Sequence, residues 1–290
     1  MDPLPAETAP MSRLATFALV GNAMVCALSL LGTFALLHNL APEHAGNARL
    51  ATLFGLLNIL TAFVAAVACA VLREGPRRTA VLVLIAVTIA LLMELGGTTI
   101  GFPFGRYEYT DFLGPKLFGL VPWVLPFTWF TVAYPALAMA ATLRPRGPLA
   151  PLVAGLLLTL ADVPMDPAMN TGYASWRWID GGAWYGMPLS NWLGWLGTGI
   201  LLWLIVRRLP GPVRPASIRT ALVWYVQCAF MGGLAALYAR PLALWAWLAG
   251  AAPLALLLWR HHRRSAPARG ELPESDLMVS GTAARPPLSP

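Results

Sequence analysis

The sequence predicts an all-α fold, a polytopic transmembrane helical bundle, and three observations support this prediction. Of the 290 residues, 58% are hydrophobic and only 11% are charged, against roughly 25% charged residues in soluble domains. The mean hydropathy is +0.64. The apolar residues form continuous runs of about 20, the length that crosses a bilayer as a helix, rather than the alternating segments of a membrane barrel. A water-soluble enzyme, a disordered chain, a coiled coil and a disulfide-stapled domain are therefore excluded.

Eight apolar runs are long enough to be considered as membrane spans, although the fifth is short. The last two are separated only by Ala239-Arg240-Pro241, so seven spans are the alternative. We expect the first run to be a retained helix rather than a signal peptide, because it is too long for one and acidic residues precede it. The eight runs are 14–37, 50–72, 79–100, 117–143, 149–165, 188–206, 218–239 and 241–259.

Most basic residues fall in alternate loops, which predicts that both termini are cytoplasmic in a multi-pass protein of the inner, cytoplasmic membrane. These arginines also account for the net charge of +7 through topology and contact with anionic lipid, without nucleic acid. The predicted cytoplasmic set is Arg13, Arg73, Arg77, Arg78, Arg144, Arg146, Arg207, Arg208, Arg214, Arg219, Arg260, Arg263 and Arg264. The opposite set is Arg49, Arg106, Lys116, Arg177 and Arg240.

The domain organisation is predicted to be simple. Residues 1–264 form a single transmembrane domain with a motif-rich core at 90–200. Residues 265–290 are polar and rich in Pro, Ala and Ser, which predicts a disordered cytoplasmic tail. The three cysteines lie singly in apolar runs and are expected to behave as small hydrophobic residues.

Ionisable groups at membrane depth are the most informative residues, because they are costly there unless they have a function. Glu94 lies in the third run and Asp162 near the end of the fifth, with Asp166 four residues later. A continuing helix would place both aspartates on one face, but Pro164 and Pro167 make that continuation doubtful. The predicted topology brings all three carboxyl groups, and Asn191 at the start of the sixth run, toward the non-cytoplasmic side.

The two longest loops, 101–116 and 166–187, lie on that same side and are rich in aromatic residues. An aromatic belt at the membrane interface is the simpler explanation for any one of these side chains. Arg106 beside Glu108 and Asp111 is equally explained as a solvated loop pair, and Asp166 before Pro167 as a helix cap. In the fourth run, Pro122, Pro126 and Pro135 free backbone carbonyls, which is tolerated where a cavity or other groups satisfy them.

Several chemistries lack support in the sequence. There is no GxGxxG or P-loop, no HExxH, no paired-cysteine metal site and no GxSxG elbow, and each of these motifs is needed for its chemistry. Three functions use intramembrane carboxyl groups without those motifs: proton-coupled transport, aspartyl proteolysis, and acid–base chemistry on a lipid-soluble substrate.

Two blocks of motifs in 90–200 bear on the choice between these options. The first block is Glu94-x-x-Gly97, Gly101-x-Pro-Phe-Gly-x-Tyr-x-Tyr109, Leu113-Gly-Pro115, Val121-Pro122, Pro126-x-x-Trp129 and Tyr134-Pro135. The second is Asp162-x-x-x-Asp166-Pro167, Trp176-x-Trp178, Gly182-x-x-Tyr185-Gly186-x-Pro188 and Asn191-x-x-Gly194-Trp195. Together they resemble the membrane carotenoid hydratases, the bisanhydrobacterioruberin and γ-carotene 1,2-hydratase family. Outside 90–200 the chain resembles this family only in having hydrophobic helices.

The resemblance implies a cofactor-independent hydro-lyase of carotenoid biosynthesis. It would add water to the terminal double bond of a carotenoid ψ-end, of the lycopene, γ-carotene or C50 type, and leave a tertiary alcohol. No metal and no redox cofactor are expected. The implied partners are the carotenoid polyene, water, the lipid bilayer and other enzymes of carotenoid biosynthesis.

That chemistry assigns roles to the residues singled out above. Protonation of an isolated alkene needs a neutral carboxyl group, and an apolar setting favours the protonated form. We expect Asp162 or Glu94 to be the general acid, the other carboxyl group and Asp166 to position water, and Asn191 to bind that water or a carboxylate. Aromatic faces can stabilise the cation. The expected substrate-binding residues are Arg106, Tyr107, Tyr109, Trp129, Trp178 and Tyr185.

Three rival functions remain at the level of sequence. A proton-coupled transporter would use the same carboxyl groups as a relay and the prolines as hinges. An intramembrane aspartyl protease would need different aspartate motifs. A prenyltransferase would need aspartate-rich sites for magnesium diphosphate, which are absent.

Overall fold

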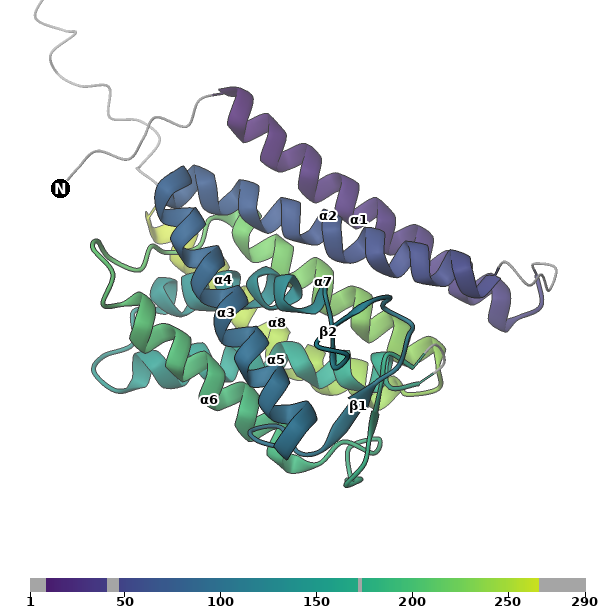
Figure 1. Cartoon of the computed structure of the whole chain (residues 1–290). Helices are drawn as coiled ribbons and strands as arrows, with labels where there is room; N and C mark the ends of the chain where they lie inside the picture. The colour runs from purple at the N-terminus through teal and green to yellow at the C-terminus, as the bar shows by residue number, and fades with distance from the viewer. Residues whose placement is uncertain (1–8, 41–46, 172–173, 266–290) are drawn as a thin grey trace, which may run out of the picture.

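The computed structural model describes residues 9–40, 47–171 and 174–265, and eight helices lie in these ranges (Figure 1). The predicted tail at 265–290 lies outside the described residues except for Ser265, which ends α8. The helices are α1 (Ala9–Leu37), α2 (Asn47–Glu74), α3 (Pro76–Ile100), α4 (Leu125–Leu143), α5 (Leu149–Met169), α6 (Leu189–Val206), α7 (Ile218–Leu237) and α8 (Pro241–Ser265).

Seven of the helices in the described ranges are long and apolar enough to cross a membrane, and α4 is the exception. α4 contacts α2, α3, α5, α6, α7 and α8, and nearly all of its residues are buried. Because its neighbours enclose it, α4 packs against protein rather than lipid. The prediction of an all-α polytopic bundle is confirmed, and the protein is a multi-pass membrane protein.

The fourth predicted span, 117–143, is wrong at its beginning. α4 starts only at Leu125, and Pro126 lies in its first turn, where a missing N–H costs nothing. Residues before it form strands β2 (Lys116–Leu117) and β3 (Val121–Pro122), which pair antiparallel across a turn. That turn needs positive φ angles at Phe118 and Gly119, so a helix cannot run through it. Pro135 is the proline that lies inside the helix.

The doubt about the fifth span is also resolved, because α5 continues through Pro164 and Pro167 to Met169. Pro167 has no N–H to donate to the carbonyl of Val163, four residues earlier. The indole N–H of Trp184 donates to that carbonyl instead, at 3.3 Å. A side chain from the following loop therefore replaces the lost helical bond, and Asp162 and Asp166 lie on one face.

The two long loops are joined by a small sheet at one end of the bundle, which we call the sheet end. Strand β1 (Tyr107–Tyr109) pairs antiparallel with β4 (Trp176–Trp178), with Tyr107 opposite Trp178 and Tyr109 opposite Trp176. Alternate residues of a strand share a face, so both tyrosines and both tryptophans lie on one side. Glu108 and Arg177 lie on the other side, which is exposed.

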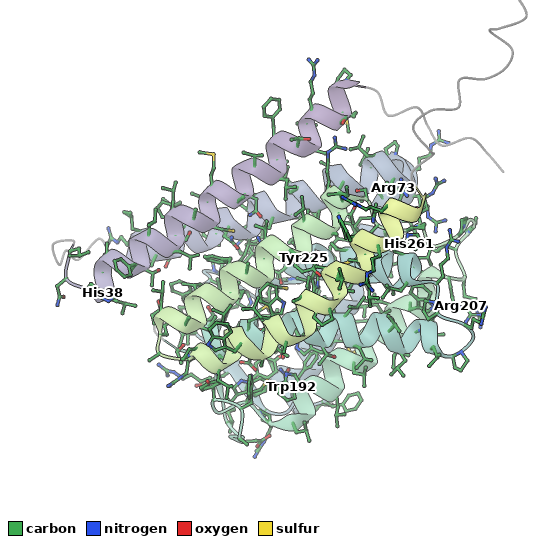
Figure 2. All side chains as sticks on the ribbon, turned by 180° about the vertical axis from the view of Figure 1, so that it is seen from behind. His38, Arg73, Trp192, Arg207, Tyr225 and His261 are labelled. Atoms are coloured by element: carbon green, nitrogen blue, oxygen red, sulfur yellow. The ribbon has the colours of Figure 1, made fainter. Side chains whose placement is uncertain are left out.

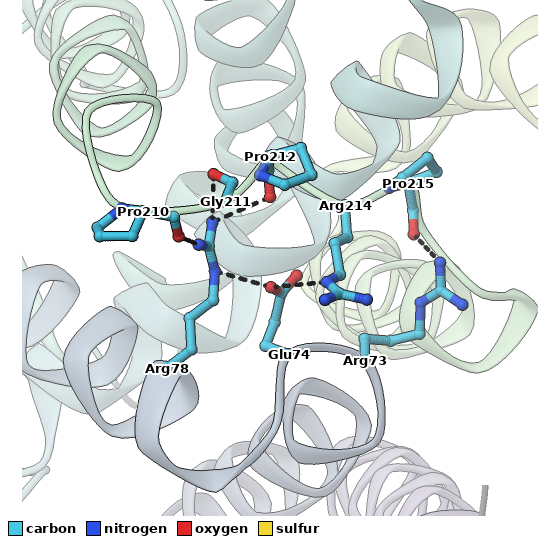
Figure 3. A network of polar contacts seen from close by, with 8 residues as sticks. All are labelled: Arg73, Glu74, Arg78, Pro210, Gly211, Pro212, Arg214 and Pro215. Carbon is cyan, nitrogen blue, oxygen red and sulfur yellow. Dashed lines mark hydrogen bonds and ion pairs between the residues drawn. The ribbon is translucent and has the colours of Figure 1, made fainter. Parts of the chain in front are cut away.

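The opposite end, which we call the arginine end, is where α2 meets α3 and α6 meets α7. Figure 2 shows Arg73, Arg207 and His261 at this end and His38 at the other. Glu74, almost fully buried, lies between the guanidinium groups of Arg78, at 2.9 Å, and Arg214, at 3.6 Å. Figure 3 shows the remaining contacts of this network, which lead from Arg73 and Arg78 to carbonyl oxygens of the α6–α7 loop: Pro210, Gly211, Pro212 and Pro215.

Candidate active site

Glu94 lies on the buried face of α3, one turn before Gly97. Its Oε2 atom accepts hydrogen bonds from the hydroxyl groups of Tyr107, at 2.5 Å, and Tyr109, at 2.7 Å. Its Oε1 atom accepts one from the indole N–H of Trp129 on α4, at 2.9 Å. A Cβ atom at Gly97 would lie 2.6 Å from the Tyr107 ring. The glycine of the Glu94-x-x-Gly97 motif therefore lets the tyrosine cross α3 and reach the carboxyl group.

Asp162 and Asp166 are fully buried one turn apart on α5. The amide nitrogen of Asn191, in the first turn of α6, donates to Asp162 Oδ2 at 2.8 Å and is 3.3 Å from Asp166 Oδ2. One amide therefore joins the two carboxyl groups. In the described part of the chain Asp162 accepts no other hydrogen bond, since the buried indole N–H of Trp192 lies beside it but outside hydrogen-bonding geometry.

Strand β4 provides two donors for Asp166, and the amide nitrogen of Asn170 adds a longer contact to Oδ1, at 3.4 Å. The indole N–H of Trp176 donates to Asp166 Oδ1 at 2.9 Å, and that of Trp178 lies 2.9 Å from Oδ1 and 3.2 Å from Oδ2. The same strand pairing places the Tyr107 and Trp178 rings 5.1 Å apart. The β1–β4 sheet therefore aims two hydroxyl groups at Glu94 and two indoles at Asp166.

A cavity of about 440 Å³ connects these groups. Its polar wall contains Glu94, Asp162, Asp166 and Asn191. Beside them, the rings of Trp129 and Trp195 stack with centroids 4.2 Å apart and an interplanar angle of 13°, and Phe104 packs on Trp129 at 5.8 Å. Side chains of α1, α2 and α7, most of them apolar, line another part of the cavity. The site thus combines carboxyl groups with aromatic faces in a mostly apolar space.

The electrostatics of this site depend on neutral donors. Among the described residues, the ion pairs join Glu74 to Arg78 and Arg214, Asp180 to Arg106, and Asp111 to Lys116, so none involves the three cavity carboxyl groups. Burial, together with the nearby Glu94 carboxyl, raises the pKa of the Tyr107 and Tyr109 hydroxyls well above the usual value. Both phenols therefore stay protonated and act as hydrogen-bond donors.

The structure brings together eight of the residues selected from the sequence, and all of them line the cavity: Glu94, Asp162, Asp166, Asn191, Tyr107, Tyr109, Trp129 and Trp178. It does not bring Arg106 and Tyr185 to the part of the cavity that the described residues form. Arg106 is exposed and its guanidinium group contacts Asp180 at 2.6 Å, not the predicted Glu108 or Asp111. Tyr185 lies beneath the guanidinium group of Arg240, 5.2 Å from the ring centroid.

Most of the other cavity residues were not predicted from the sequence, and three aromatic ones close to the carboxyl groups are Phe104, Trp176 and Trp195. Two of them carried a usable signal. Trp176 precedes Trp178 by two residues, which is the spacing of one strand face. Trp195 follows Asn191 by four, which is the spacing of one helix face.

Comparison with known proteins now identifies the family. The chain matches the family described as "Carotenoid biosynthesis protein" over residues 52–258, well over half of its length. The chain belongs to this family. The matched region of this carotenoid biosynthesis protein contains every cavity carboxyl group and the whole of the β1–β4 sheet.

A curated relative gives a narrower comparison for this carotenoid biosynthesis protein. This chain is 35% identical over 130 residues to a bisanhydrobacterioruberin hydratase of Haloarcula japonica, and the match covers 42% of this chain. The chain spans 43% of the length of that relative. No solved structure matches the chain.

Proposed function

We propose that the protein is a carotenoid hydratase, which adds water across the terminal double bond of a carotenoid ψ-end and produces a tertiary alcohol. One observation carries this proposal: three buried carboxyl groups share a mostly apolar cavity with stacked aromatic rings, and among the described residues only neutral groups donate to them. Membership of the carotenoid biosynthesis family and the similarity to a bisanhydrobacterioruberin hydratase support it.

The hydrogen bonds around each carboxyl group support a division of roles. Glu94 accepts from three donors. Asp166 accepts from four, namely Trp176, Trp178, Asn170 and Asn191. A carboxyl group surrounded by donors is favoured as the anion, which only accepts. Asp162 accepts from Asn191 alone in the described residues, so one of its oxygen atoms is available to carry a proton. Asp162 is therefore the proposed general acid.

The proposed reaction balances with water as the sole co-reactant. The Asp162 proton adds to C2 of the terminal double bond, and the electron pair of that bond leaves a tertiary cation at C1. The faces of Trp129 and Trp195 stabilise this cation, and the Glu94 carboxylate provides the opposite charge. Water attacks C1 and gives one proton to Asp166. Transfer of a proton from Asp166 to Asp162, one helical turn away, restores the starting state.

The proposed setting of this reaction is the cytoplasmic membrane, with both termini in the cytoplasm. The described chain begins with α1 and ends with α8 at the arginine end (Figure 1), and basic loops favour the cytoplasmic side. A polyene would then lie in the bilayer with its end group in the cavity. Other carotenoid-biosynthesis enzymes are proposed as partners, because they make and consume the same lipid-soluble molecules.

The test is expression in a bacterial host that already makes a ψ-end carotenoid such as lycopene or γ-carotene. We expect a new pigment that is heavier by one water, detected by chromatography and mass spectrometry. An empty vector provides the control. If the protein accumulates in the membrane and neither these substrates nor an acyclic C50 carotenoid gain water, the hydratase proposal is wrong. Movement of an unmodified solute would instead support the proton-coupled transporter.

A further inference from the structure

A second hollow lies at the arginine end of the bundle, away from the cavity with the carboxyl groups. It has a volume of about 320 Å³ and lies between the ends of α4 and α6, the start of α5 and the α6–α7 loop. Ala141 lines this hollow and Trp129 lines the cavity, so about 18 Å of α4 separates the two, at 1.5 Å per residue. We call it the recess, and its walls include Ala141, Arg144, Ala150, Trp203, Arg207 and Pro212.

The α6–α7 loop, which forms one wall of the recess, is held in place by its neighbours. Arg78 of α3 donates to the carbonyl oxygen of Pro212 at 3.0 Å (Figure 3). The backbone N–H of Ala216 donates to Thr142 Oγ1 of α4 at 2.8 Å. These bonds attach the loop to α3 and α4. The recess is therefore formed by the protein itself, and a ligand need not order it first.

Two arginines border the recess at the ends of two helices. Arg144 is the C-cap residue of α4, and Arg207 is that of α6. Both are exposed, and within the described ranges neither guanidinium group has a hydrogen bond or an ion pair. A cation at a helix C-terminus is favourable by itself, so the arginines alone do not indicate a ligand.

The indole of Trp203 does indicate a ligand, because it is buried and its polar atom is unused. Trp203 lines the recess and is 8% exposed. Among the described residues its N–H donates to no acceptor, and it is not enclosed as the unpartnered N–H groups of Trp224 and Trp247 are. A buried donor without an acceptor is costly. An acceptor bound in the recess would satisfy it.

The charge of the recess selects an anion. In the described part of the chain no carboxyl group lines it, and Glu74, a carboxyl group of the same end, is engaged by Arg78 and Arg214. The planar guanidinium group matches two oxygen atoms of one phosphate. Two guanidinium groups and an indole N–H together suit an anion with several oxygen atoms, as a phosphate group has.

The surface beside the recess is apolar, which favours a phosphate that carries acyl chains. Leu149 and Leu152 at the start of α5 are 54% and 39% exposed, and Leu204 near the end of α6 is 40% exposed. Leu149 adjoins Ala150 in the chain and Leu204 adjoins Trp203, so this surface begins where the recess ends. A free phosphate would contact only the basic part, whereas a phospholipid would cover both.

We propose that the recess binds the phosphate group of an anionic phospholipid, which contacts Arg144, Arg207 and the indole N–H of Trp203. The bound lipid connects α4, α6 and the α6–α7 loop, so it stabilises the folded protein over the unfolded chain. This proposal does not depend on the proposed hydratase function, because the recess is separate from the cavity.

The first experiment measures lipid binding by the purified full-length protein in detergent, without a carotenoid. Native mass spectrometry counts bound lipids, and thermal unfolding reports their effect on stability. We expect phosphatidylglycerol to remain bound and to raise the melting temperature. Phosphatidylcholine and inorganic phosphate at the same concentration should do neither. Equal effects of the two lipids overturn the anionic headgroup, and an equal effect of inorganic phosphate shows a free-anion site and overturns the lipid.

Variants of the lining residues locate the site. Arg144→Gln with Arg207→Gln should weaken phosphatidylglycerol binding by about tenfold or more, since hydrogen bonds to a charged group are lost. Arg146→Gln with Arg208→Gln is the matched control, because it removes the same charge from exposed arginines that, in the described structure, do not line the recess. The control should bind as the wild type does. Equal losses in the two double variants indicate general attraction to a basic surface and overturn the site.

Two single variants keep the proposal testable if the double variant does not accumulate. Trp203→Phe retains the ring and both charges and removes the N–H, so we expect roughly fivefold weaker binding, the effect of one net hydrogen bond. Arg207→Gln changes a C-cap with an ordinary right-handed backbone, at φ −65°, and should weaken binding by about as much or more. Wild-type affinity in both single variants overturns the proposed contacts.

Discussion

The sheet end and the arginine end each bury carboxyl groups, but in opposite ways. Glu74 at the arginine end has two guanidinium partners, Arg78 and Arg214. Glu94, Asp162 and Asp166 have indole, hydroxyl and amide donors and, within the described residues, no cation. The guanidinium groups use Glu74 to join segments of the chain, whereas the cavity carboxyl groups, among neutral donors, are available for acid–base and electrostatic roles. This difference distinguishes Glu74, whose contacts are structural, from the three cavity carboxyl groups, which are candidates for catalysis.

Replacing Asp162 by Asn should have the largest effect. Asn cannot deliver a proton to the alkene, so we expect hydration to fall by about 10²–10⁴-fold while the protein still accumulates. Pigment analysis in the expression host, normalised to protein in the membrane, measures this. Glu108→Gln removes an exposed carboxyl group from β1 and serves as the matched control. Full activity of Asp162→Asn would remove this residue from the proposed mechanism.

Replacing Glu94 by Gln should reduce hydration by about 10²-fold, because the charge that offsets the cation is lost in a site of low dielectric. The double variant Tyr107→Phe and Tyr109→Phe keeps the carboxyl group and removes two of its three donors. We expect a smaller loss, of roughly tenfold, as for a weakened positioning contact. The activities of the purified wild type, Glu94→Gln and the double variant are compared with one substrate. If the double variant is less active than Glu94→Gln, the tyrosines act directly and not through Glu94.

The matched change at the arginine end, Glu74→Gln, should alter stability rather than chemistry. It leaves Arg78 and Arg214 without their anion, but both guanidinium groups are partly exposed. We therefore expect a loss on the order of 2 kcal/mol, less than for a fully buried pair, and normal turnover by the protein that remains folded. Thermal unfolding in detergent and activity per folded molecule test this. A selective loss of turnover would contradict the contrast between the two ends.

The smallest effect is expected at Asp180, an exposed carboxyl group at the sheet end. Hydrogen bonds from Arg106 lower the pKa of Asp180 below its usual value of 3.8. Its contribution to stability is thus present above that value and lost as the pH falls through the lowered pKa. The difference in melting temperature between the wild type and Asp180→Asn should be small at neutral pH and vanish on acidification. A difference that grows at low pH would contradict this assignment.

The cavity contacts that the sequence could predict are those with a local signal. Glu94 and Asp162 were evident because an ionisable group in an apolar run is rare, and the aromatic loops were evident from their composition. The continuation of α5 was not, because the bond that replaces the one lost at Pro167 comes from Trp184, seventeen positions along the chain and on another segment. Arg106 was assigned to neighbours in sequence, while its partner Asp180 is reached across the β1–β4 pairing.

The sequence by itself determined that this is a multi-pass helical membrane protein with carboxyl groups at membrane depth, because composition, run length and the rarity of buried charge are properties of single segments. The tertiary structure decided which donors meet which carboxyl group. Strand pairing between two loops aims Tyr107 and Tyr109 at Glu94, and Trp176 and Trp178 at Asp166. Helix packing places Asn58 of α2 and Gln227 of α7 on the same cavity as these carboxyl groups. These arrangements depend on the register between distant segments, and no local pattern encodes that register.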